Sequence, residues 1–180
     1  MCKPGYYANQ LVGQETFNST CTACSPGQYT DDMKAPPNNV DSEGGPIICK
    51  SCPAGSWHGG LSVDGEPAAS LRECKVCPAG FFGLETGRNV PCTRCSIGWH
   101  KPDAGSGPCY VCPAGKSQND SGRSHCSICP PGLYQGREKQ PLCLPCDRGR
   151  HQPFQNMADC MSCPPGTAQN ELGSSSCLPW

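Results

Sequence analysis

The residues of this sequence whose type and spacing could do chemistry are its cysteines. The chain has 18 of them in 180 residues, and all but the first and the last belong to Cys-x2-Cys pairs. Such a pair can hold half of a zinc site, act as a redox centre, or contribute to structural disulfides. The chemistry therefore depends on how the pairs recur and on what surrounds them.

The pairs recur as a tandem repeat. From Cys92 to Cys177 they advance by 17 residues each time, and the earlier loops are longer. Because the second cysteine of each pair opens a unit, the sequence predicts nine repeats. Their ranges are 1–23, 24–51, 52–76, 77–94, 95–111, 112–128, 129–145, 146–162 and 163–180.

Each repeat carries the same local signals. Glycine follows the opening cysteine by three residues in all nine repeats, and seven of them have proline in between, which predicts a tight turn. An aromatic residue or histidine is common five residues after the cysteine, whereas repeats 6 and 9 have Ser117 and Ala168 there. The aromatic residues and histidines at this position in the other seven repeats are Tyr7, Tyr29, Trp57, Phe82, His100, Tyr134 and His151. A second glycine, ten residues after the cysteine, predicts the return turn at Gly87, Gly105, Gly122 and Gly173.

Composition indicates how such repeats are held together. Ile, Leu, Val and Phe number 23 of 180 residues, too few for a large apolar core. The net charge of -1 gives neither the self-repulsion of a disordered chain nor the basic surface of a nucleic-acid binder. No apolar run approaches membrane-spanning length, so we expect neither nucleic acid nor membrane insertion. Disulfide bonds are the remaining way to stabilise a fold of this composition, and they predict an extracellular or cell-surface location.

Zinc and redox chemistry are the rival interpretations of the pairs. Eight tandem pairs would bind four zinc ions and leave Cys2 and Cys177 over, and zinc does not explain the recurring glycine. No pair is distinguished from the others, and none lies in a thioredoxin-like pattern. We therefore expect no metal and no cofactor.

The phase of the cysteines favours pairing each one with the next across its loop. An interleaved scheme uses cysteines in fours, and 18 is not divisible by four, although sequence alone cannot settle the connectivity. The sequential scheme closes nine loops, and each disulfide is expected to stabilise the fold by roughly 3 kcal/mol. These are Cys2–Cys21, Cys24–Cys49, Cys52–Cys74, Cys77–Cys92, Cys95–Cys109, Cys112–Cys126, Cys129–Cys143, Cys146–Cys160 and Cys163–Cys177.

The predicted fold is small, disulfide-rich and mostly β or irregular, with little or no helix. It is an elongated tandem-repeat rod of nine single-disulfide units, with strands of two or three residues. Stacking would bury the aromatic residue of one repeat against the disulfide of the next.

The pattern Cys-Pro-x-Gly-x-aromatic, a small polar loop with glycine, and then Cys-x2-Cys resembles the ephrin-receptor-like cysteine-rich repeat. It is also similar to the first module of tumour-necrosis-factor-receptor cysteine-rich domains. The match covers essentially the whole chain and is best from Cys77 to Cys177. The resemblance implies the same sequential pairing, an extracellular stapled rod and no enzyme activity. Such repeats occur in receptors, adhesive proteins and surface proteins, so the architecture is better specified than the role.

Other candidate residues carry weaker signals. The four histidines, His58, His100, His125 and His151, lack metal-ligand spacing, and packing is the favoured interpretation for the two at the aromatic position. Sequons at Asn18 and Asn119 predict N-glycosylation. The long inserts of repeats 2 and 3 are candidate surfaces for an extracellular protein ligand.

The two ends of the sequence suggest self-association. The final Leu178-Pro179-Trp180 follows Cys177 as Leu144-Pro145 follows Cys143, so Trp180 could dock on Tyr6 or Tyr7 of another copy. The leading prediction is a glycosylated structural protein that assembles head to tail into a filament, stalk or surface fibre. The alternative is a receptor or adhesion segment that binds a ligand through repeats 2 and 3. Without a leader sequence before Cys2, a secreted form is expected to be processed or part of a longer chain.

Overall fold

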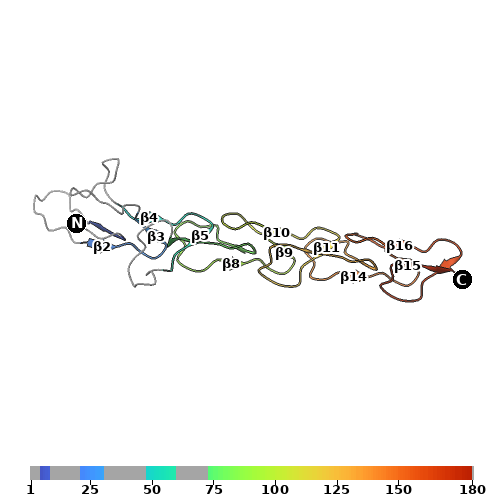
Figure 1. Cartoon of the computed structure of the whole chain (residues 1–180). Coiled ribbons are helices and arrows are strands. Elements are labelled where there is room, and N and C mark those ends of the chain that lie inside the picture. The colour runs from blue at the N-terminus through green and yellow to red at the C-terminus, as the bar shows by residue number, and fades with distance from the viewer. Residues whose placement is uncertain (1–4, 9–20, 31–47, 60–72, 180) are drawn as a thin grey trace, which may run out of the picture. The chain divides into compact units, whose positions relative to one another are not determined.

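The computed structural model describes residues 5–8, 21–30, 48–59 and 73–179 (Figure 1). Within these ranges the regular structure consists of short strands, and no α-helix is present. The strands pair consecutively into two-stranded antiparallel sheets, one for each repeat. They are β1 (Tyr6–Ala8), β2 (Cys21–Ala23), β3 (Gln28–Tyr29), β4 (Lys50–Ser51), β5 (Ser56–Trp57), β6 (Lys75–Val76), β7 (Phe81–Phe82), β8 (Thr93–Arg94), β9 (Trp99–His100), β10 (Tyr110–Val111), β11 (Lys116–Ser117), β12 (Ser127–Ile128), β13 (Leu133–Tyr134), β14 (Leu144–Pro145), β15 (Arg150–His151), β16 (Met161–Ser162), β17 (Thr167–Ala168) and β18 (Leu178–Pro179).

Each hairpin begins at the tight turn that the sequence predicts after the opening cysteine. In repeat 6 the N–H of Lys116 donates to the carbonyl of Pro113 at 3.1 Å, and Gly115 between them has φ of +83°. A positive φ at the third position is typical of a type II turn and favours glycine. The equivalent glycine has a φ between +76° and +85° in all nine repeats. The predicted turn is therefore confirmed.

Sequential disulfides close the hairpins. Eight bridges have Cα–Cα distances between 5.6 and 5.8 Å, and they join Cys24–Cys49, Cys52–Cys74, Cys77–Cys92, Cys95–Cys109, Cys112–Cys126, Cys129–Cys143, Cys146–Cys160 and Cys163–Cys177. Cys21 is also disulfide-bonded, and its expected partner Cys2 lies outside the described residues. The sequential scheme is confirmed for eight bridges, which leaves no thiolates among these cysteines for a zinc ribbon.

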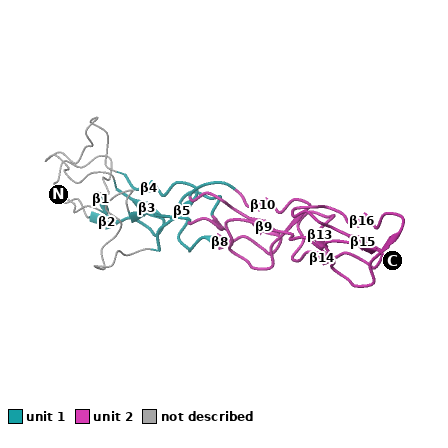
Figure 2. Ribbon diagram, turned by 45° about the vertical axis from the view of Figure 1, so that its right-hand side comes forward, with its two compact units in different colours: residues 1–77, 83–92, 105–107 teal, residues 78–82, 93–104, 108–180 magenta. Residues whose placement is uncertain are grey.

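The chain divides into two compact units, coloured in Figure 2. The first comprises Met1–Cys77, Gly83–Cys92 and Gly105–Gly107, and the second comprises Pro78–Phe82, Thr93–Ala104 and Pro108–Trp180. In both, the buried apolar residues are cysteines, with Tyr29 as the one exception among the described residues, and the opening cysteines from Cys52 to Cys146 are fully buried. The disulfides thus replace the apolar core that the composition does not provide.

Neighbouring repeats are joined by backbone hydrogen bonds. Between repeats 7 and 8, the N–H of Gly132 donates to the carbonyl of Gln152 at 2.7 Å, and the N–H of Gln135 to that of Met157 at 3.2 Å. In return, the N–H of Asn156 donates to the carbonyl of Cys129 at 2.8 Å. The same three bonds join repeats 5 and 6, 6 and 7, and 8 and 9. Because these bonds use the main chain, they tolerate the variable sequence of the loops.

Repeats 2 to 7 each also contact the repeat that is two positions further along the chain. A Cβ placed on Gly132 of repeat 7 would lie 2.0 Å from the carbonyl oxygen of Gly173 in repeat 9. A Cβ on Gly173 would in turn lie 3.4 Å from Pro145 and 3.8 Å from Leu133. We call such a place a seat, formed by the turn glycine, the residue after it and the residue before the opening cysteine of the next repeat. Equivalent seats bring together Gly27 and Gly87, Gly80 and Gly122, Gly98 and Lys139, and Gly115 and Asn156.

The residue that occupies each seat has a positive φ. The four glycines predicted at the return turn all adopt it, with φ between +67° and +91°. Lys139 and Asn156 hold the same position in repeats 7 and 8, at φ of +60° and +64°. Sequence analysis missed these two because only glycine signals a left-handed conformation reliably.

Candidate functional site

In four repeats, the residue five positions after the opening cysteine contacts the disulfide of the following repeat. His100 Nδ1 lies 3.1 Å from Cys126 Sγ, and His151 Nδ1 lies 3.1 Å from Cys177 Sγ. Ser117 Oγ lies 3.4 Å from Cys143 Sγ in the same way. In the first compact unit, Tyr29 is buried in a cluster with Cys52 and Cys74. The predicted packing against the next disulfide is therefore confirmed for Tyr29, His100 and His151, and Ser117, an exception to the sequence pattern, makes a similar contact.

Two of these joints gather metal-ligating atoms. The candidate ligand atoms of His100, Cys112 and Cys126 all lie within 4.8 Å of one another, and His151, Cys163 and Cys177 form a second cluster of the same kind. In the oxidised chain each sulfur is bonded to another sulfur, and the ligand form of cysteine is the thiolate. The oxidised clusters are therefore packing joints rather than metal sites.

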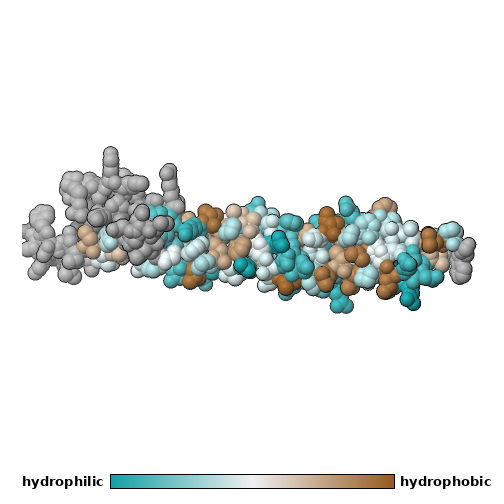
Figure 3. Space-filling model, turned by 60° about the horizontal axis from the view of Figure 1, so that its bottom comes forward, coloured by the Kyte–Doolittle hydropathy of each residue, from teal (hydrophilic) through white to brown (hydrophobic). Residues whose placement is uncertain are grey.

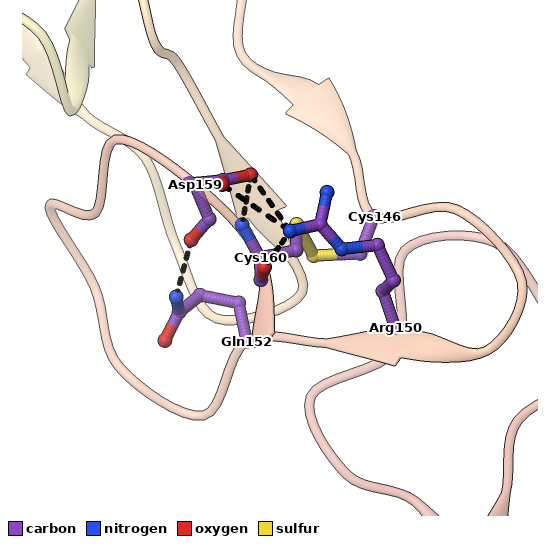
Figure 4. Close-up of polar contacts among 5 residues, drawn as sticks. All are labelled: Cys146, Arg150, Gln152, Asp159 and Cys160. Carbon is purple, nitrogen blue, oxygen red and sulfur yellow. Dashed lines mark hydrogen bonds and ion pairs between the residues drawn. A yellow bond between two sulfur atoms is a disulfide. The ribbon is translucent and has the colours of Figure 1, made fainter. Parts of the chain in front are cut away.

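A glutamine side chain bridges the backbone of the loop in repeats 6 to 9, an arrangement that we call a brace, and the glutamine is buried in repeats 6 to 8. Gln152 is fully buried, and its side-chain amide donates to the carbonyl of Asp159 at 2.6 Å (Figure 4). Its side-chain oxygen accepts the N–H of Phe154 at 3.1 Å. The same pair of bonds is made by Gln118, Gln135 and Gln169. Sequence analysis missed this brace, although glutamine recurs at 17-residue intervals six positions after the opening cysteine.

Asp159 links its loop to the hairpin of repeat 8. Its carboxylate accepts the N–H of Cys160 at 2.7 Å and lies 3.2 Å from the guanidinium of Arg150 (Figure 4). Arg150 also donates to the carbonyl of Cys160. The pKa of Asp159 is lowered below its ordinary value, mainly by the hydrogen bond from the Cys160 amide and next by the one from Arg150.

The lowered pKa gives a pH prediction. A carboxyl whose pKa is lower in the folded chain stabilises the fold above the unfolded pKa of about 3.9. That contribution is lost as the pH falls through the folded value. Arg150→Leu should raise the pKa of Asp159 partway, because the Cys160 amide remains as a donor. NMR titration of the Asp159 carboxyl in the natural sequence and in the Arg150→Leu variant measures this pKa. An unchanged pKa would contradict the role given to Arg150.

The last two repeats have open seats. Gly149 and Gly166 have φ of +76° and +82°, as in the occupied turns. Nothing in the described chain lies within 4 Å of a Cβ placed on either of them. Next to Gly166, β17 pairs with β18, and Leu178 of β18 is 62% exposed. The described structure thus has two seats without occupants.

The structure places the other predicted residues as follows. Tyr6 and Tyr7 are half-buried on β1, and Leu178 and Pro179 are exposed on β18. Asn119 is exposed in the loop of repeat 6. Trp180, Asn18 and most of the inserts of repeats 2 and 3 lie outside the described residues.

Exposed apolar side chains do not form one continuous surface on the face that Figure 3 shows. They appear there as separate patches among polar residues. Over the described residues, the apolar side chains that are more than half exposed include Tyr110, Leu142, Phe154 and Leu172. No helix in the described ranges is long and apolar enough to cross a membrane.

Comparison with known proteins supports the repeat assignment. Residues 115–156 match the family model described as tyrosine-protein kinase ephrin type A/B receptor-like. The matched segment spans most of repeats 6 to 8, so this part of the chain carries an ephrin-receptor-like cysteine-rich repeat. A search of curated proteins returns no significant match.

Proposed function

We propose that this chain is an extracellular structural protein that assembles head to tail with copies of itself into a filament, stalk or surface fibre. Ephrin-receptor-like repeats and a high density of disulfides are typical of extracellular proteins. The proposal assigns the chain no catalytic activity. The disulfide-linked repeats themselves perform the proposed structural function.

The observation that carries the proposal is that a seat joins repeats that are not neighbours in the sequence, so its two sides can also come from two copies of the chain. The seat at Gly166 has nearly the same parts as the occupied seat at Gly132: both follow Cys-Pro-Pro, and both have Leu-Pro on the paired strand. In repeat 7 that seat holds Gly173. Repeats of a second copy have the same type of turns and can occupy the open seats. Contacts of this heterologous kind extend without closing.

Glycosylation fits an array of this kind. Asn119, Asp120 and Ser121 are all exposed, so a glycan on Asn119 would extend into solvent without disturbing the joints. We place N-glycans at Asn119 and, from its sequon, at Asn18. In the proposed fibre the glycan on Asn119 projects from an exposed loop and leaves the seats accessible.

The test is assembly of the oxidised chain, followed by sedimentation and electron microscopy over a range of concentrations. The natural sequence should form linear assemblies that lengthen with concentration. Gly166→Asn should leave the monomer folded, because asparagine tolerates the positive φ of a type II turn, but its side chain would fill the seat. We expect this variant to lower the apparent association constant at least about tenfold, the effect of a 1.4 kcal/mol loss.

Lys139→Asn is the matched control. Lys139 also has a positive φ and occupies the internal seat at Gly98. Asn156 occupies the equivalent seat at Gly115, which shows that asparagine fits a seat of this kind. Assembly of this control should equal that of the natural sequence. Equal assembly by Gly166→Asn would exclude the seat as the contact. Single chains at every concentration would reject the fibre and favour the receptor alternative, with ligand binding through repeats 2 and 3.

A further inference from the structure

The disulfides divide the backbone into loops and links. Each described bridge closes a loop within one repeat, and a link of two residues leads from the closing cysteine to the opening cysteine of the next repeat. Hydrolysis of a peptide bond inside a loop leaves both pieces joined through the cystine. None of the eight described bridges spans a link, so hydrolysis there separates the chain.

Basic residues are distributed unevenly between loops and links. Three of the eight links contain a basic residue, and these three, with Lys50, Lys75 and Arg94, join repeats 2 to 5. From Cys95 to Cys177 all seven lysines and arginines lie inside loops. A protease that cuts after lysine or arginine can therefore only nick repeats 5 to 9, whereas it can divide the chain at the links before them.

The link between repeats 2 and 3 exposes the most chain around its basic residue. Ile48 is 58% exposed, Lys50 and Ser51 are exposed, and Cys49 is half-buried. A protease binds the residues around the bond that it cuts in an extended conformation, and β4, which is this link, already has that conformation. Because β4 pairs with β3 over only two residues, a local opening that breaks few hydrogen bonds presents it to a protease.

The other two basic links are held by further contacts. The ammonium of Lys75 lies 5.2 Å from the centre of the Trp57 ring. The guanidinium of Arg94 lies 5.9 Å from the centre of the Phe81 ring, and the next residue, Cys95, is 0% exposed. A basic side chain that packs on an aromatic ring must give up this attraction to enter the specificity pocket of a protease. Both links are therefore expected to be cut more slowly than the link at Lys50.

We propose that the Lys50–Ser51 bond is a processing site for a serine protease of trypsin-like specificity, which releases repeats 3 to 9 as one covalent body. The Lys50 ammonium enters the acidic specificity pocket of the protease. The protease serine attacks the Lys50 carbonyl carbon, and the carbon–nitrogen bond breaks as the Ser51 nitrogen takes a proton and leaves. Water then hydrolyses the acyl-enzyme and gives the Lys50 carboxylate. This reaction concerns a single chain and does not depend on the proposed assembly.

The experiment is brief digestion of the oxidised natural sequence with trypsin. The pieces are separated with and without a reductant, and mass spectrometry identifies their ends. Without a reductant, the first piece to separate should begin at Ser51 and retain repeats 3 to 9, whatever nicks their loops carry. With a reductant, the same piece should fall apart into the peptides between those nicks.

Lys50→Gln and Lys75→Gln are matched variants, because both residues directly follow a closing cysteine in an exposed link. Lys50→Gln should slow the first separation at least about tenfold, since glutamine has no charge for the specificity pocket. Lys75→Gln should leave that rate unchanged. A first piece that begins at Val76 or Cys95 would overturn the proposal. So would equal rates for Lys50→Gln and the natural sequence, or an oxidised chain that trypsin does not divide.

Discussion

Replacing Gly132 with alanine is expected to destabilise repeats 7 to 9 by at least about 3 kcal/mol. Part of this cost is the positive φ of +84°, which costs a non-glycine residue about 1–3 kcal/mol. The larger part arises because the new Cβ would lie 2.0 Å from the carbonyl oxygen of Gly173. Neither atom belongs to a flexible side chain, so the overlap can be relieved only by opening the seat.

Gly166→Ala is the matched control for this prediction. Gly166 follows the same Cys-Pro-Pro sequence and has a φ of +82°, but a Cβ on it would meet nothing within 4 Å. Its substitution should therefore cost only the strain of the turn, about 1–3 kcal/mol. Because a repeat array need not unfold in one step, amide exchange at Gly173 is the suitable measurement. Equal effects of the two substitutions would contradict the claim that contact with Gly173 makes Gly132 intolerant of a methyl group.

The contrast between these glycines shows which parts of the fold can be predicted from sequence. The turn after each opening cysteine is predicted by the glycine three residues later, with proline before it in seven repeats. The phase of the cysteines favours the sequential pairing without settling it. The seat involves residues such as Gly132 and Gly173, which lie two repeats apart. A search for turns treats both glycines alike, although only their contact makes Gly132 intolerant of a methyl group.

The histidines and glutamines were harder to predict for related reasons. His100 and His151 were assigned to packing, and that packing is present, but their approach to a sulfur depends on how one repeat stacks on the next. Glutamine is usually exposed, so its recurrence in the loops does not by itself indicate burial. The brace becomes evident only in the structure, where Gln152 hydrogen-bonds the backbone of Asp159 and of Phe154 within one loop.

Gln152→Leu tests the brace and should destabilise repeat 8 by about 2–4 kcal/mol, because two backbone groups lose their hydrogen bonds. Leucine is close to glutamine in size, so little of the effect would come from a cavity. The carbonyl of Asp159 and the N–H of Phe154 are the groups left without partners. Faster amide exchange at Phe154 and a lower denaturation midpoint should report the loss.

Gln169→Leu is the comparison that separates the hydrogen bonds from their burial. Gln169 makes the equivalent bonds to Ser176 and Glu171 in an exposed setting, where water can replace them. Its substitution should cost less than about 1 kcal/mol. A difference of this size would mean that the stacked neighbour, by excluding water from Gln152, gives the brace its strength. Equal costs would instead place that strength in the loop alone, and each repeat would then be stabilised independently of its place in the array.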